Sequence, residues 1–153
     1  MNKAITPDKD MHKNDPYIVS ALFYIRGENF NPDEATAQLG ILPFSKHQKG
    51  DQHGEKGEMV WKSGFWAIET KSIVNSENVE HHIEWILDRL DKAKDEFELI
   101  RSREDVHIEL EIIISLFRRS WNGSISLKTI KRLSEMSIPF SFSVSYLAYA
   151  DEE

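Results

Sequence analysis

The longest strand-forming run in this chain reads Val106-His107-Ile108-Glu109-Leu110-Glu111-Ile112-Ile113-Ile114-Ser115-Leu116. Six apolar residues occupy every second position from Val106 to Leu116. Because the side chains of a β-strand point alternately to the two faces of its sheet, this period of two indicates a strand with one apolar face. The other face begins with His107, Glu109 and Glu111. The run therefore predicts a central strand in a sheet that has one side in the core.

The segments on either side of this run repeat one order of elements. Near the start, a strand over 17–26 is followed by a short helix and then by Pro43. Near the end, a strand that reaches 119 is followed by an Asn122-Gly123 turn, a short helix and then Pro139. This order predicts a sheet built from two related β-α halves, each ferredoxin-like. Few positions match, so duplication and chance both remain open as the origin of the repeat.

Three helices are indicated by their start and stop signals. Asn31 is the expected N-cap of a short helix, which has Pro32 in its first turn and Gly40 at its end. Ser76 is the expected N-cap of the longest helix, which continues or restarts after a kink toward 101. Ser126 begins the third. We therefore expect an α+β fold with a single antiparallel-rich sheet of about five strands and the helices packed on one face.

Length and composition limit the classes of protein to which this chain can belong. At 153 residues, a single α+β domain is expected over 17–149, between a flexible polar leader (1–16) and an acidic tail (150–153). The chain has no cysteine, which excludes thiol catalysis and sulfur-ligated zinc and is consistent with the cytoplasm, where we expect the protein to work. No run of about 18 apolar residues occurs, so we expect no membrane span.

The charge balance favours some partners over others. The formal net charge is -7 at neutral pH. Because nucleic acid is bound through lysine and arginine contacts to phosphate, an acidic chain argues against a nucleic-acid partner. Its field instead attracts a basic protein. Modest acidity also keeps a protein in solution, and that interpretation stays open beside the first.

One face of the predicted sheet is polar and is our first candidate for a binding surface. An antiparallel sheet can keep one face in water, where it is free to dock a partner. Two other interpretations stay open: the face is simply solvated, or the 45–58 loop covers it. The residues expected on this face are Tyr24, Arg26, His107, Glu109, Glu111, Ser141, Ser143 and Ser145.

A second candidate lies in the polar, glycine-broken segment 45–58, which we expect to be a mobile loop or a wide hairpin tip. A small-molecule or enzymatic site between this loop and the sheet would use His47, Asp51 and Trp66. The histidine spacings supply no set of three or four converging ligands, so no metal site is predicted. No cofactor-binding or catalytic motif occurs, and no cofactor is expected.

A set of motifs is spread over most of the chain: residues 19–27, Phe30 with Pro32, residues 39–41 with Pro43, His47 with Gly50-Asp51, and residues 64–66, followed by 125–127 and 138–146. In these motifs the chain resembles a bacterial family of domains of unknown function, DUF4279. These motifs consist of glycine, proline and apolar residues. The resemblance therefore implies a shared fold and carries over no active site.

Two functions of different class are compatible with these observations. The first is a non-catalytic protein-binding module, for example an immunity protein that neutralises a basic toxin. It follows from the acidity, the small size and the open sheet face. The second is the small-molecule or enzymatic site at the 45–58 loop.

Overall fold

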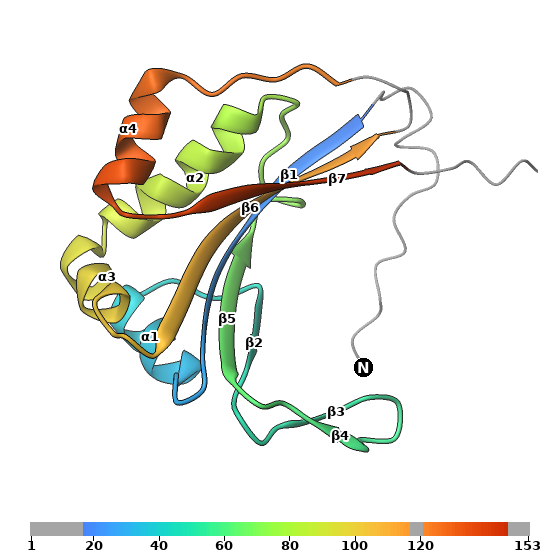
Figure 1. Ribbon diagram of the computed structural model, residues 1–153, viewed down its shortest axis with the longest axis vertical. Helices are drawn as coiled ribbons and strands as arrows, with labels where there is room; N and C mark the ends of the chain where they lie inside the picture. Colours follow the sequence, from blue (N-terminus) through green and yellow to red (C-terminus); the bar gives the residue numbers. More distant parts are fainter. Residues whose placement is uncertain (1–16, 117–120, 147–153) are drawn as a thin grey trace, which may run out of the picture.

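A computed structural model describes residues 17–116 and 121–146 of the chain. The leader and the acidic tail expected at 1–16 and 150–153 lie outside the described residues. In the part that is described, four helices and a five-stranded mixed sheet form an α+β fold, together with a small two-stranded ribbon (Figure 1). The predicted fold class is confirmed.

The five-stranded sheet has the order β2-β5-β1-β6-β7. Its strands are β1 (Tyr17–Gly27), β2 (Ser45–His47), β5 (Gly64–Glu69), β6 (Val106–Leu116) and β7 (Phe140–Tyr146). Every neighbouring pair is antiparallel except β6 and β7, which are parallel. The run 106–116 forms the interior strand β6, which pairs with β1 along its whole length, while β1 is the middle strand of the five. The ribbon consists of β3 (Gln52–His53) and β4 (Met59–Val60).

The helices are α1 (Pro32–Leu39), α2 (Val79–Asp91), α3 (Lys94–Arg101) and α4 (Leu127–Glu135). The number exceeds the three expected because the long helix stops at Asp91 and restarts at Lys94. All four lie on one side of the sheet (Figure 1). Among the described residues, no helix has the length and apolar character needed to cross a membrane.

Capping explains where two of the helices begin. The Asn31 side chain accepts hydrogen bonds from the main-chain N–H groups of Asp33 and Glu34, as expected. The expected cap of α2 is wrong by two residues: Asn78 is the N-cap, and the Ser76 hydroxyl accepts a hydrogen bond from the Asn78 N–H instead. The Ser76 hydroxyl thus binds the main chain just before the helix and does not cap its first turn.

The two β-α segments reach their second strand in related ways. After α1 the chain enters β2. This strand is antiparallel to β5, and β5 is in turn antiparallel to β1. β2 therefore runs parallel to β1 with β5 inserted between them. After α4 the chain enters β7, which lies directly beside β6 and parallel to it. Both segments are thus strand–helix–strand crossovers, as the repeat suggests, and their common origin stays a prediction.

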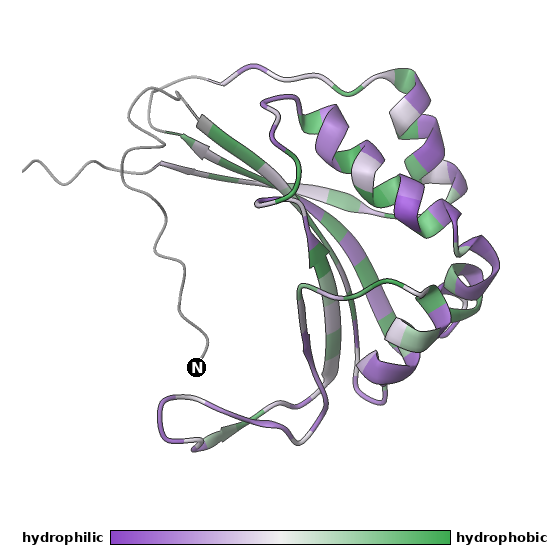
Figure 2. Cartoon of the chain, turned by 180° about the vertical axis from the view of Figure 1, so that it is seen from behind, coloured by the Kyte–Doolittle hydropathy of each residue, from purple (hydrophilic) through white to green (hydrophobic). Residues whose placement is uncertain are grey.

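The core lies between the sheet and the helices. β1, β5 and β6 each contribute alternate buried residues, and Figure 2 shows the alternation of hydrophilic and hydrophobic positions along the long strands. α2 buries Ile83, Ile86, Leu87 and Leu90 against this face. β7 differs: its apolar residues share the helix-facing side with β6, yet they are 38% to 68% exposed, because α4 packs against α2 rather than over this edge.

Candidate functional site

The face opposite the helices is open over the part of the chain that the structure describes. Figure 1 shows the sheet bent, with this open face on the inside of the bend and the β3–β4 ribbon projecting from its lower end. Strand pairing arranges its residues in rows that cross the sheet. The rows are His47–Phe65–Arg26–His107, Ala67–Tyr24–Glu109, Glu69–Leu22–Glu111–Ser141, Ser20–Ile113–Ser143 and Ile18–Ser115–Ser145. All eight residues expected on the polar face occur in these rows.

A hydrogen-bond network joins three strands at the centre of the open face. Tyr24 donates from its hydroxyl to Glu109 Oε2 at 2.7 Å, and Ser141 donates to Glu109 Oε1 at 2.5 Å. His107 Nε2 lies 3.1 Å from Glu109 Oε2. We call Tyr24, His107, Glu109 and Ser141 the tyrosine network. The Glu109 carboxylate is its acceptor, so it ties β1, β6 and β7 together.

The network fixes the ionisation of its two acidic groups. Hydrogen bonds from Ser141, Tyr24 and His107 lower the pKa of Glu109 to about 2. Burial, followed by the hydrogen bond to the Glu109 carboxylate, raises the pKa of Tyr24 to about 12. At neutral pH Glu109 is therefore a carboxylate and Tyr24 a neutral phenol. General acid–base catalysis needs a pKa near the working pH, and these two shifts move away from it.

The next row carries two carboxylates with a leucine between them. Glu69 and Glu111 are the direct cross-strand neighbours of Leu22 on β5 and β6. We call these three residues the acidic row. Neither carboxylate forms an ion pair or a hydrogen bond with another described residue. Burial raises the pKa of Glu69, because a partly desolvated carboxylate favours its neutral form, and the charge of Lys71 offsets this only in part.

The remaining predicted residues of this face are accessible. Arg26, Ser143 and Ser145 are exposed, and 51% of the His107 side chain is exposed. Arg26 forms no hydrogen bond or ion pair with another described residue. Together with the acidic row, these residues make a surface of mixed charge, on which the glutamate carboxylates outnumber the one guanidinium group named here, that of Arg26.

Aromatic rings continue the surface toward the ribbon. The Trp61 ring stacks on His47 at 3.8 Å and on His53 at 3.9 Å between centroids, with interplanar angles of 11° and 18°. Two rings at such short distances must lie on opposite faces of the indole, so Trp61 is held between them. His47 also stacks on Phe65 at 5.2 Å, and Phe65 on Tyr24 at 5.8 Å. Burial lowers the pKa of His47.

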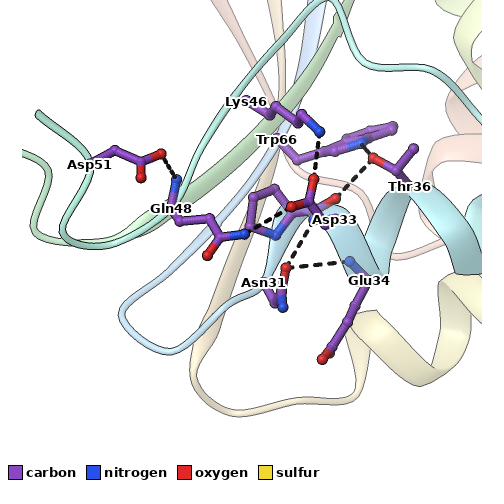
Figure 3. A network of polar contacts seen from close by, with 9 residues as sticks. Asn31, Asp33, Glu34, Thr36, Lys46, Gln48, Asp51 and Trp66 are labelled. Carbon is purple, nitrogen blue, oxygen red and sulfur yellow. Dashed lines mark hydrogen bonds and ion pairs between the residues drawn. The ribbon is translucent and has the colours of Figure 1, made fainter. Parts of the chain in front are cut away.

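The second candidate site is assembled only in part. His47 and Asp51 line a shallow hollow of about 350 Å³ beside the start of α1. Trp66 does not join them: it is fully buried on the helix side of β5, where its indole N–H donates to Thr36 Oγ1 at 3.0 Å (Figure 3). The alternation along β5 points Trp66 into the core and its neighbour Phe65 to the open face. The expectation that all three residues converge is therefore wrong for Trp66.

The polar groups around this hollow are bonded to one another. Figure 3 shows Lys46 and Gln48 converging on Asp33, in an ion pair from Lys46 and a hydrogen bond of 2.9 Å from Gln48 Nε2. Asp51 accepts a hydrogen bond of 2.7 Å from the Gln48 main-chain N–H. The segment 45–58, expected to be a mobile loop or a wide hairpin tip, contains β2, β3 and the turn that joins the antiparallel strands β3 and β4, and it is tied to the start of α1. Within the described residues, no group of three or more histidine or acidic side chains could hold a metal ion.

Sequence reasoning missed four residues of the open face: Leu22, Trp61, Phe65 and Glu69. The alternation of 65–69 already separates Glu69 from Trp66 and Ile68, and this was the available signal. The alternation does not reveal that β5 pairs with β1, and it is this pairing that brings Glu69 beside Leu22. Strand pairing depends on contacts between distant segments, so the acidic row is visible only in the fold.

Comparison with known proteins identifies the family and goes no further. No curated protein and no solved structure matches the chain significantly. The family described as Domain of unknown function (DUF4279) matches residues 16–147, which is nearly the whole chain. The match spans every described strand and helix, including those that build the open face. The chain therefore belongs to the DUF4279 family of domains.

Proposed function

We propose that this protein is a non-catalytic binding module whose open sheet face docks a basic segment of a partner protein. The observation that carries the proposal is the acidic row. Glu69 is partly desolvated and forms no ion pair or hydrogen bond with another described residue. Burial raises its pKa more than the charge of Lys71 lowers it, so an ion-paired cation would further favour its charged form. A lysine or arginine side chain of a partner would supply that cation, and Leu22 would pack against the apolar part of the same side chain.

The tyrosine network supports binding rather than proton transfer. Glu109 and Tyr24 are held in single ionisation states around neutral pH, with pKa values of about 2 and about 12. Their hydrogen bonds lock side chains from neighbouring strands in one arrangement. A rigid, charged surface of this kind loses little conformational entropy when a partner docks on it.

The most concrete form of the proposal is an immunity protein, which works in the bacterial cytoplasm by neutralising a toxin. An acidic chain attracts a basic toxin over a distance, so the partners meet faster than neutral proteins would. The formal net charge of -7 gives the sign of this attraction. Neighbouring genes provide a direct check, because an immunity gene should lie beside the reading frame of its toxin.

The test is capture of a basic partner by the immobilised full chain. The double variant Glu69→Gln/Glu111→Gln should weaken capture roughly tenfold, because it removes both charges that face the bound cation. Raising the salt concentration should weaken capture by the wild type and should have less effect on the variant. Calorimetry at acidic pH, close to the ordinary carboxylate pKa of 4.5, in buffers of different ionisation enthalpy should also detect release of protons when the partner binds, because binding lowers the pKa of Glu69.

The matched control is Asp95→Asn/Glu96→Gln, which removes two exposed carboxylates from α3 on the helix side. It changes the net charge by the same amount but leaves the open face intact. Equal loss of capture in both double variants would show that only the overall charge matters. Unchanged capture by Glu69→Gln/Glu111→Gln would exclude the acidic row.

A small-molecule site at the hollow beside His47 and Asp51 is the second candidate. Its volume of about 350 Å³ lies within the usual range for ligand sites. Its polar groups, however, already bond to one another, so a ligand would have to displace them. A thermal-shift screen of metals and metabolites tests it, since a ligand that binds only the folded state raises the melting temperature. The shift should disappear in Asp51→Asn if the hollow is the site.

A further inference from the structure

β7 leaves one edge of the main sheet without a partner strand among the described residues. It pairs with β6 on one side only. The Leu110 N–H donates to the Pro139 carbonyl at 3.0 Å, so the main-chain groups of the odd-numbered residues face β6. Because these groups alternate along a strand, the N–H and C=O groups of Phe140, Phe142 and Val144 face the free edge. They are a row of unused donors and acceptors.

The two edges of the sheet differ in how they are protected. The opposite edge strand, β2, is only three residues long, carries Lys46 and follows Pro43 closely. Short length, charge and proline are the usual features that keep an edge from pairing with another chain. β7 also follows a proline, Pro139, but it is seven residues long, carries no charged residue and reads Phe-Ser-Phe-Ser-Val-Ser-Tyr. Its four apolar side chains are also partly exposed, with Phe142 at 47% and Tyr146 at 68%.

We propose that β7 pairs with β7 of a second copy of this chain, antiparallel and centred on Ser143. In this register Phe142 lies opposite Val144 of the second copy, and Phe140 lies opposite Tyr146. The outward main-chain groups then meet in about eight hydrogen bonds. Opposed residues of an antiparallel pair share a face, so all the apolar side chains gather on the helix side and the serines on the open side.

Charge and aromatic packing favour a second copy as the occupant of this edge. Each chain has a formal net charge of -7, so two copies repel each other over most of their surfaces. β7 has no Asp, Glu, Lys or Arg, and two copies can approach there without opposing like charges. Its exposed rings already form a cluster, with Phe140 6.0 Å from Phe142 and Trp121 6.5 Å from Phe142 between centroids. Pairing would remove much of this apolar surface from water.

The first measurement is the mass of the full chain in solution, by light scattering or sedimentation over a range of concentrations. The wild type should form a dimer of twice the chain mass. Ser143→Lys should shift it to the single-chain mass, because the two introduced lysines would lie directly opposite each other. Ser143 is exposed, so the fold of the single chain should tolerate the change.

The second measurement fixes the register and does not depend on disrupting the pair. The chain has no cysteine, so a single introduced thiol can only link two chains to each other. Ser143→Cys should form a disulfide-linked dimer under mild oxidation, because directly opposed residues that share no main-chain hydrogen bonds have Cα atoms about 4.5 Å apart. The matched control is Ser145→Cys, also exposed and on the same face. Its two copies would be about four residues apart along the strands, or roughly 13 Å, which is too far for a disulfide.

A wild type of single-chain mass at all concentrations would overturn the proposal. So would a wild-type dimer in which Ser143→Cys fails to cross-link, or in which Ser145→Cys cross-links equally well. Binding of a basic partner to the open face is a separate matter, because both open faces remain accessible in this arrangement.

Discussion

Glu109 shows how a single carboxylate can link the strands of a sheet at one point. It accepts hydrogen bonds from Tyr24 on β1 and Ser141 on β7, and it contacts His107 on its own strand. Among the described strands, β7 pairs through its main chain with β6 alone. The carboxylate is thus a cross-link between the edge strand and the middle strand, and its charge state controls that link.

The ionisation of Glu109 should appear in the acid stability of the protein. Its pKa is about 2 in the folded chain against an ordinary value of 4.5, so the charged form stabilises the fold above pH 4.5. That contribution should be lost as the pH falls from 4.5 to about 2. Urea unfolding at several pH values should show a smaller decline in this window for Glu109→Gln than for the wild type. An unchanged decline would contradict the role of the network, and Glu96→Gln is the control.

Glu69 should show the opposite effect, since burial raises its pKa. A raised folded-state pKa means that the charged group opposes folding at neutral pH and ceases to do so as the pH falls. Glu69→Gln should therefore raise the free energy of unfolding at pH 7 by an amount on the order of 0.5 kcal/mol. Chemical denaturation measures it. A variant that is more stable but binds its partner less well would identify Glu69 as a binding residue, whereas a loss of stability would contradict this account.

At the scale of elements, the start of α1 holds the edge strand β2 of the sheet and the residue that follows it. Its cap Asn31 fixes the first turn, and Asp33 in that turn holds both Lys46 and Gln48 of the β2 segment. The start of this helix therefore positions the segment that carries His47.

Removing the cap should weaken this connection. Asn31→Ala leaves the N–H groups of Asp33 and Glu34 without their acceptor and should lower the free energy of unfolding by about 1 kcal/mol. Hydrogen exchange should show the first turn of α1 and the β2 segment opening together. Asn29→Ala, an exposed change just before the helix, is the control and should have little effect. Opening of α1 alone would show that the two elements are not coupled.

Local sequence signals predicted the helices and strands better than they predicted which strands pair with each other. The period of two in 106–116 and the Asn31–Gly40 signals correspond to β6 and α1 because they depend on residues close in sequence. The pairing of β2 with β5 depends on contacts between distant segments, whereas the cap at Asn78 is a local signal that competes with Ser76 two residues earlier. The candidate site follows the same rule. Its members on β6 were predicted from alternation, while Glu69 and Phe65 needed the strand order.

At the scale of the whole molecule, all the large buried side chains lie between the sheet and one layer of helices. This division separates two tryptophans that are close in sequence. Trp66 is fully buried in that layer, whereas Trp61 is 37% exposed on the opposite side, between His47 and His53. One belongs to the core and the other to the surface of the ribbon.

Truncation of the two rings should therefore have unequal effects. Trp66→Ala should lower the free energy of unfolding by about 3–5 kcal/mol, because it leaves a cavity in the core. Trp61→Ala should cost about 1 kcal/mol or less, because it removes stacking contacts of a partly exposed ring. Denaturant titration followed by circular dichroism measures both. Similar losses would show that the ribbon contributes to the core.

The late position of β7 in the chain has a consequence for biosynthesis. β1, β5 and β6 form a contiguous antiparallel array from segments that precede it, whereas the last strand can join only after α4 has crossed over the sheet. While the nascent polypeptide emerges, the outer edge of β6 stays uncovered, and such edges recruit foreign strands. Translation products that stop before β7 should therefore accumulate in inclusion bodies, and chaperones should engage the nascent chain until β7 has emerged.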